Sequence, residues 1–212
     1  MKKALFAITV CLFLLTSINE SKASVLGNFD GFALGARGGM NILNTDLADY
    51  LDPGPQGAIY FRKFLPDGIY GGVSLIYHTF GEYDGEKNGL KETLSYSDIT
   101  LAATAGLYFL NPSESVSPFI EGSLGYSFYN QKYTMGNSYS REAYAQMLYL
   151  APGAGVSFPL TPNILIAGKI SYTITVTPGD ITEDLKGTPG THDGGITDYQ
   201  FISIVAGIEF IF

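Results

Sequence analysis

Apolar and polar residues alternate along eight segments of the chain, as expected of β-strands with one face in an apolar environment. The last segment shows this most clearly: in steps of two back from Phe212 to Ile202, every residue is apolar. Between them, Glu209, Gly207 and Ser203 mark the other face as small or polar. The eight predicted strands are Phe29–Ile42, Gln56–Phe64, Ile69–Phe80, Leu94–Leu110, Pro118–Gln131, Tyr144–Phe158, Ile164–Val176 and Asp198–Phe212.

The connections between these segments alternate between long and short. The long ones are Leu43–Pro55, Gly81–Thr93, Lys132–Ala143 and Thr177–Thr197, and the short ones are Leu65–Gly68, Asn111–Ser117 and Pro159–Asn163. This pattern predicts an all-β chain that forms an eight-stranded, antiparallel, up-and-down transmembrane β-barrel, with both termini on the side of the short turns. Pro152 lies inside the sixth strand, where it cannot donate to a ladder, and therefore predicts a bulge.

The first 23 residues have the features of a secretory signal peptide. Lys2 and Lys3 precede an apolar run, and the polar stretch after it ends in Ser21-Lys22-Ala23. The run is too short to span a membrane, so we expect cleavage after Ala23 and a barrel domain over residues 24–212. Cys11, the one cysteine of the chain, leaves with the signal, and the mature chain therefore has no disulfide or thiol ligand.

Charge and composition exclude several classes of protein. Loss of three lysines and one glutamate with the signal shifts the net charge from −8 to −10, which disfavours nucleic acid as a partner. Beyond the signal, no apolar run reaches the ~20 residues of a membrane-spanning helix. The 15 tyrosines and 14 phenylalanines favour β structure. The sequence contains no cofactor-binding motif.

The apolar, alternating last strand with its aromatic end resembles the C-terminal strand of small eight-stranded outer-membrane barrels of the OmpX and OmpA-transmembrane type. The resemblance implies an assembly signal in Phe212, Phe210 and Gly207, recognised by barrel-assembly machinery after periplasmic chaperones deliver the chain. It also implies a monomer in the outer membrane of a Gram-negative bacterium, surrounded by phospholipid and lipopolysaccharide. The expected role is structural, or adhesion and binding of a host or extracellular ligand through four outer loops.

Five charged residues are expected to face the lumen: Arg37, Arg62, Glu121, Lys169 and Glu209. A barrel of ~8 strands is just wide enough for side chains to fill it, and buried charges must be paired. We therefore expect a closed polar plug, with Lys169 and Glu209 as a candidate pair on neighbouring strands. A narrow pore or a path for protons or ions is the alternative.

Two other groups of residues are candidates for a catalytic site or a metal site. Ser74, His78 and Glu82 share one face of the third strand, and a lipid-modifying enzyme would use a serine and a histidine in this way. Residues four apart on a strand are separated by ~13 Å, too far for a nucleophile and its base, so we expect no enzyme. The longest loop carries four acidic residues and one histidine: Asp180, Glu183, Asp184, His192 and Asp193. Their spacing matches no calcium loop, so we expect these side chains to be solvated rather than to bind a metal.

Overall fold

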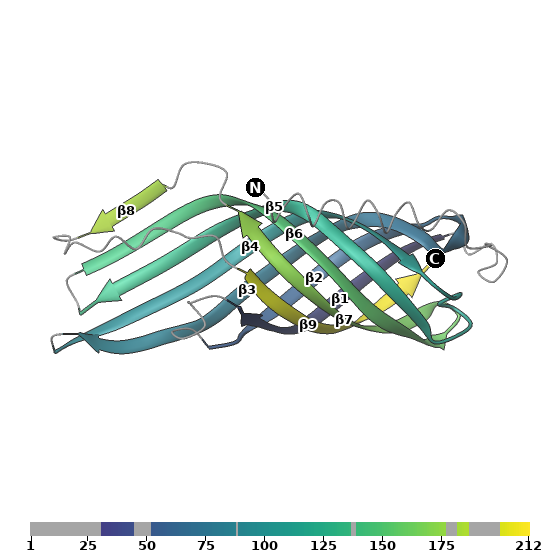
Figure 1. The fold of residues 1–212 in the computed structure, drawn as a ribbon, viewed down its shortest axis with the longest axis horizontal. Coiled ribbons are helices and arrows are strands. Elements are labelled where there is room, and N and C mark those ends of the chain that lie inside the picture. The colour runs from purple at the N-terminus through teal and green to yellow at the C-terminus, as the bar shows by residue number, and fades with distance from the viewer. Residues whose placement is uncertain (1–30, 45–51, 88, 137–138, 177–181, 187–199) are drawn as a thin grey trace.

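Eight antiparallel strands close into a barrel in the computed structural model, which describes residues 31–44, 52–87, 89–136, 139–176, 182–186 and 200–212. Each strand pairs with the next along the chain, and the last strand pairs with the first to close the barrel (Figure 1). The strands are β1 (Gly31–Leu43), β2 (Gly54–Phe64), β3 (Ile69–Lys87), β4 (Leu90–Tyr108), β5 (Ser117–Met135), β6 (Tyr139–Thr161), β7 (Ile164–Val176) and β9 (Gln200–Ile211). The predicted fold is confirmed.

Two shorter elements accompany the barrel. A 3-10 turn, η3 (Pro66–Gly68), joins β2 to β3 at the end of the barrel where Phe212 lies. The short strand β8 (Thr182–Lys186) pairs with the far end of β6 rather than with the barrel wall. No helix among the described residues has the length and hydropathy to cross a membrane.

The barrel has an apolar outside and a largely polar inside. Large apolar side chains such as Leu34, Ile59, Leu101 and Ile170 are 53–58% exposed on the outer face. Neighbours of these residues along the same strands, such as Thr100, point inward and are buried. This arrangement is the reverse of a soluble barrel, in which the apolar face points inward, and it matches a barrel whose outside lies in lipid.

Four of the strands are longer than the sequence pattern predicted. β3, β4 and β5 each have 19 residues and β6 has 23, whereas β1, β2, β7 and β9 have 11–13. Much of the predicted loops Gly81–Thr93 and Lys132–Ala143 is therefore strand (Figure 1). These extensions form a sheet on one side of the barrel mouth, which we call the protruding sheet: residues 81–97 of β3 and β4 and 130–144 of β5 and β6.

The predicted bulge at Pro152 is wrong. Pro152 pairs with Gly122 of β5 in unbroken register, and the β6–β7 pairs on either side of it keep one register. The β6–β7 ladder instead omits Ala151 and Pro152. The ladder is therefore interrupted without the insertion of an extra residue, because the missing N–H of proline removes a hydrogen bond but does not require a shift.

Candidate functional site

An ion-pair network centred on Glu121 lies inside the barrel. Arg37 donates to its carboxylate at 3.0 and 3.2 Å, and Arg62 donates at 2.5 Å. Lys169 reaches the same carboxylate at 2.8 Å, and the Tyr70 hydroxyl donates to it at 3.0 Å. Glu121 is only 4% exposed, so these four side chains from β1, β2, β7 and β3 provide the compensation that a buried charge requires.

Glu209 of β9 is the second interior carboxylate. Its Oε2 lies 3.3 Å from Nη1 of Arg62, in an ion pair that lacks the geometry of a hydrogen bond. The predicted pairing of Glu209 with Lys169 is wrong, because Lys169 contacts Glu121. Lys169 stands opposite Val205, four residues from Glu209 and therefore ~13 Å away along β9. The lumen is narrow enough that the Lys169 side chain reaches Glu121 of β5 instead.

Tyrosine rings surround the two interior arginines. The guanidinium carbons of Arg37 and Arg62 lie 4.1 and 4.3 Å from the centroid of the Tyr60 ring, and Arg62 also lies 4.6 Å from that of Tyr70. The five lumen residues comprise three bases and two acids, so they carry one more positive charge than negative charges. The electron-rich faces of the rings offset part of this excess.

Two buried clusters fill the barrel above and below the charge network. At the end where Phe212 lies, the cluster comprises Ala33, Phe64, Tyr70, Tyr108, Phe119, Leu165, Ala167 and Ile211. Toward the protruding sheet, it comprises Leu43, Ile76, Phe80, Tyr96, Ala102, Tyr129, Ala143, Ala145, Met147, Tyr149, Ala151 and Phe201. The charges are thus enclosed between two sets of packed side chains, which supports a filled interior.

A second polar cluster surrounds His78, nearer to the protruding sheet. Nδ2 of Asn41 lies 3.1 Å from Nδ1 of His78, and the Ser203 hydroxyl donates to Oδ1 of Asn41 at 2.7 Å. On the other side of the ring, Nε2 lies 3.9 Å from Oδ1 of Asp98, which accepts a hydrogen bond from Thr100 at 3.0 Å. All five side chains are buried.

The geometry of this cluster bears on the hypothesis of a lipid-modifying enzyme. The described side chains include no serine that hydrogen bonds directly to His78, since Ser203 reaches Asn41 instead. The imidazole is fully buried, and it packs against the rings of Tyr149 and Phe201 at 6.0 and 5.1 Å between centroids. The cluster is a buried interior network, in which Nε2 of His78 makes no hydrogen bond to a described residue, rather than a nucleophile and base at a surface.

Sequence reasoning identified His78 but missed its partners Asn41, Asp98 and Ser203. Each of these residues was visible as a polar position on an inward face. Their convergence depends on the register of strands β1, β3, β4 and β9, and the sequence does not supply that register.

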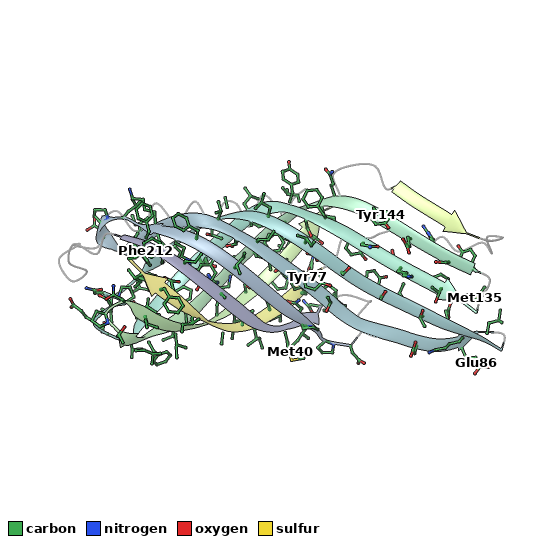
Figure 2. All side chains as sticks on the ribbon, turned by 180° about the vertical axis from the view of Figure 1, so that it is seen from behind. Met40, Tyr77, Glu86, Met135, Tyr144 and Phe212 are labelled. Carbon is green, nitrogen blue, oxygen red and sulfur yellow. The ribbon has the colours of Figure 1, made fainter. Side chains whose placement is uncertain are left out.

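The protruding sheet has two different faces. Its outer face is polar, with Lys132 3.6 Å from Glu142 and with the Tyr144 hydroxyl donating to the same carboxylate. Its inner face carries aromatic side chains, including Tyr133, whose hydroxyl donates to Glu92. Partial burial and this carboxylate raise the pKa of Tyr133 above its usual range. Figure 2 shows Glu86 and Met135 at the end of this sheet, far from Phe212.

The predicted assembly residues lie at the seam where β9 closes onto β1. Phe212 and Phe210 are 69% and 48% exposed, and the Phe212 ring stacks on that of Phe32. Gly207 faces inward, where an added Cβ would lie 2.1 Å from the carbonyl oxygen of Ala36. Close packing at the seam is thus a reason for glycine at this position.

The described residues contain no group of three or more acidic, histidine or cysteine side chains able to hold a metal. Of the acidic residues and the histidine predicted in the longest loop, Asp180, His192 and Asp193 lie outside the described residues, whereas Glu183 and Asp184 belong to β8. The predicted signal peptide also lies outside them.

The sequence matches no protein-family model, and a search of curated proteins finds no match either. Solved structures do match. Neisserial surface protein A gives a TM-score of 0.53 at 16% identity, over 86% of this chain and 97% of that one. Ail, the attachment invasion locus protein of Yersinia pestis, gives 0.51 at 17% identity, over 86% of this chain and 100% of that one.

A major outer membrane protein from Thermus thermophilus gives a TM-score of 0.56 at 12% identity, over 87% of this chain and 100% of that one. At such identities the likeness shows the fold. That fold agrees with the apolar outer face and with the resemblance carried by the last strand. The chain thus has the fold of the small eight-stranded outer-membrane β-barrels.

Proposed function

We propose that this barrel presents the protruding sheet as a binding surface for an extracellular macromolecule. The observation that carries the proposal is the extension of β3–β6 beyond the apolar band. Figure 2 shows Met40 and Tyr77 on the barrel and Glu86 and Met135 well beyond them. About six to eight residues of each strand lie in this sheet, which corresponds to ~20–26 Å at about 3.3 Å per residue. A barrel serving only to span the membrane has no need of this extension.

Surface attachment tests this proposal. One variant would replace residues 84–93 of the β3–β4 hairpin by a two-residue turn, and a second would shorten the β5–β6 hairpin likewise. Bacteria displaying either variant are expected to lose attachment to cultured host cells relative to the wild type. Glu114→Ala, in a turn at the opposite end, serves as the control. Full attachment by both shortened proteins, folded and in normal amounts, would rule out this role.

The lumen has a structural role in this proposal. The charge network and the two flanking clusters support a closed interior that stabilises the barrel, and they do not support the narrow pore. The buried His78 network likewise gives no support to a lipid-modifying enzyme. We infer that the barrel acts as a monomer, with its apolar band in contact with phospholipid and lipopolysaccharide.

Export and assembly complete the proposal. Residues 1–23 serve as the signal peptide, and Phe212, Phe210 and Gly207 serve in assembly of the barrel. The exposed aromatic rings at the seam support recognition of the first two residues. The close approach of Gly207 to Ala36 supports a packing role for the third.

A further inference from the structure

Lys63 is an exposed base on the outer face of the barrel, at the end where Phe212 lies. It is the residue before the last in β2. Its ammonium lies 5.5 Å from the centroid of the Phe32 ring, which also stacks on Phe61 and Phe212. This end carries the short turns and therefore faces the periplasm. The base thus lies at the level of the phospholipid headgroups of the inner leaflet.

Lys63 differs from other exposed lysines in its lack of an acidic partner. In the described part of the chain, its ammonium forms no ion pair with a carboxylate. By contrast, Lys91 and Lys132, at the opposite end, lie 3.3 and 3.6 Å from carboxylate oxygens of Asp84 and Glu142. An aromatic ring offsets only part of a positive charge. The ammonium of Lys63 is therefore available to an anionic group of another molecule.

A row of small residues leads from Lys63 into the apolar band. Neighbouring strands from β3 to β6 pair these outward-facing residues side by side: Gly71, Ala105, Gly122 and Pro152. Lys63 pairs with Gly71, the first of them. A Cβ added at Gly71 would have no atom nearer than 3.9 Å, and one at Gly122 would have none within 4 Å. Gly122 is the sixth residue of β5, so the row rises from the rim toward the middle of the bilayer.

Larger apolar side chains border this row on both sides. Val73 and Leu124, each 54% exposed, pair with Ala103 on the side nearer the middle of the bilayer. Ile69, which is 42% exposed, lies on the side of the rim. An acyl chain over the row would contact both borders. Every membrane lipid brings acyl chains, so such contacts hold a lipid without selecting it, and the selection must come from the headgroup.

We propose that Lys63 and the row from Gly71 to Gly122 bind an anionic phospholipid of the inner leaflet. The Lys63 ammonium donates to the phosphate oxygens of the headgroup, and one acyl chain lies along the row. A zwitterionic headgroup carries its own ammonium beside the phosphate and therefore gains less from Lys63. One lysine near a membrane surface favours anionic lipid by about fivefold. The site lies at the end opposite the protruding sheet and goes beyond the proposed function.

Tryptophan fluorescence in lipid vesicles tests the proposal, because the chain contains no tryptophan of its own. Leu124→Trp places a reporter beside the row, and Ile170→Trp places one on β7, at a site 58% exposed on the outer face. The vesicles mix phosphatidylethanolamine with phosphatidylglycerol, and one of the two carries brominated acyl chains that quench tryptophan on contact. We expect phosphatidylglycerol to be preferred about fivefold at Leu124→Trp and not to be preferred at Ile170→Trp.

Further variants, each made in the Leu124→Trp protein, separate the base from the row. Lys63→Gln should remove the preference for phosphatidylglycerol, and Lys63→Arg should keep it. Gly71→Leu keeps the base but obstructs the row, so it should reduce the preference as well. Lys91→Gln removes a lysine at the opposite end and should leave the preference unchanged. Added salt should weaken the preference, because it screens the attraction between lysine and phosphate.

Equal quenching by the two brominated lipids at Leu124→Trp would overturn the proposal, as would a preference that persists in Lys63→Gln. A preference of the same size at Ile170→Trp would also overturn it, since the whole barrel surface would then attract anionic lipid. If Leu124→Trp does not assemble, native mass spectrometry of the wild-type barrel and of Lys63→Gln provides the test. The wild type should retain more phosphatidylglycerol than the variant, and equal retention would overturn the proposal.

Discussion

Phe32 and Phe212 exchange two backbone hydrogen bonds across the seam that closes the barrel. Each amide donates to the carbonyl of the other, at 2.9 and 2.8 Å, and the two rings stack with their centroids 6.4 Å apart. Phe61 continues the stack at 5.6 Å from Phe32. The last residue of the chain is thus part of the closing ladder and of an exposed aromatic group at its end.

Deletion of Phe212 should therefore leave secretion intact and prevent assembly in the outer membrane. The variant loses both hydrogen bonds to Phe32, the outer ring of the stack and the proposed assembly signal. Membrane fractionation and the heat-modifiable mobility of the folded barrel measure the result. Phe158→Leu, which alters an exposed aromatic side chain elsewhere, is the control and should assemble. Normal amounts of folded protein after deletion of Phe212 would contradict the prediction.

A charged side chain introduced on the outer face should lower the free energy of unfolding by an amount that depends on its depth in the membrane. Leu101 is 58% exposed on the outer face of β4, so Leu101→Arg should lower the free energy of unfolding by about 2–4 kcal/mol. Leu160 is similarly exposed but lies beside the β6–β7 turn, where the same change should cost only about 0–1 kcal/mol. Reversible unfolding in lipid vesicles measures both, and equal costs would mean that the apolar band does not lie in lipid as described.

Thr100, the inward-pointing neighbour of Leu101, provides the control for which face of β4 points into the barrel. Thr100 is buried and donates to Asp98. Thr100→Ser keeps the hydroxyl and removes one methyl group, so it should cost about 0.5–1.5 kcal/mol. A loss as large as that caused by Leu101→Arg would show that the two faces are assigned wrongly.

Glu121→Ala should be among the most destabilising changes in the lumen. It removes the one carboxylate that Arg37, Arg62 and Lys169 share, and breaking a buried ion pair typically costs about 3–5 kcal/mol because the partner is stranded. Lys169→Ala alone should also destabilise, and the double variant should lose less than the sum. A double-mutant cycle in reversible unfolding measures this coupling, and additive effects would argue for solvated, independent charges.

The wild-type barrel should conduct negligibly in planar bilayers. The ion pairs at Glu121 and the clusters on either side fill the space through which ions would pass. Reconstituted protein at matched protein-to-lipid ratio, with heat-denatured protein as the blank, provides the measurement. Stable and reproducible current steps from the folded protein would favour a pore.

Gly207→Ala should destabilise the seam, whereas Gly168→Ala should be nearly neutral. A Cβ at Gly207 would lie 2.1 Å from the Ala36 carbonyl oxygen, which is part of the backbone, whereas nothing lies within 4 Å of a Cβ at Gly168. Both glycines lie within strands of the barrel. Unfolding midpoints of the two purified variants test this. Equal stability would assign Gly207 to recognition rather than to packing.

Strand alternation was enough to predict the barrel, because a wall between lipid and a polar interior imposes a period of two on every strand. The protruding sheet was missed because the contrast between apolar outward and polar inward positions fades beyond the lipid. Ser95 is only half-buried there, and Lys132 is exposed. The Asn88-Gly89 pair was the available signal, because it is a typical hairpin turn sequence and it stands between Lys87 and Leu90, which pair with each other.

The contents of the lumen were predictable by residue but not by partner. Inward positions followed from alternation, so Arg37, Arg62, Glu121, Lys169 and Glu209 were all found. Partners depend on how far one strand slides against the next and on which side chains reach across the lumen. Glu121 contacts residues 48–84 positions away in sequence, and no local pattern reports such distances.

The unequal strand lengths make the mouth of the barrel asymmetric about the barrel axis. β3–β6 form a continuous wall over half of the circumference and extend past the ends of β1, β2, β7 and β9 (Figure 1). A large molecule that approaches from the side of the wall meets its polar outer face, and one that approaches from the opposite side meets its aromatic inner face. Any partner bound to one face of this wall is therefore held in a fixed orientation within the plane of the membrane as well as at a fixed height above it.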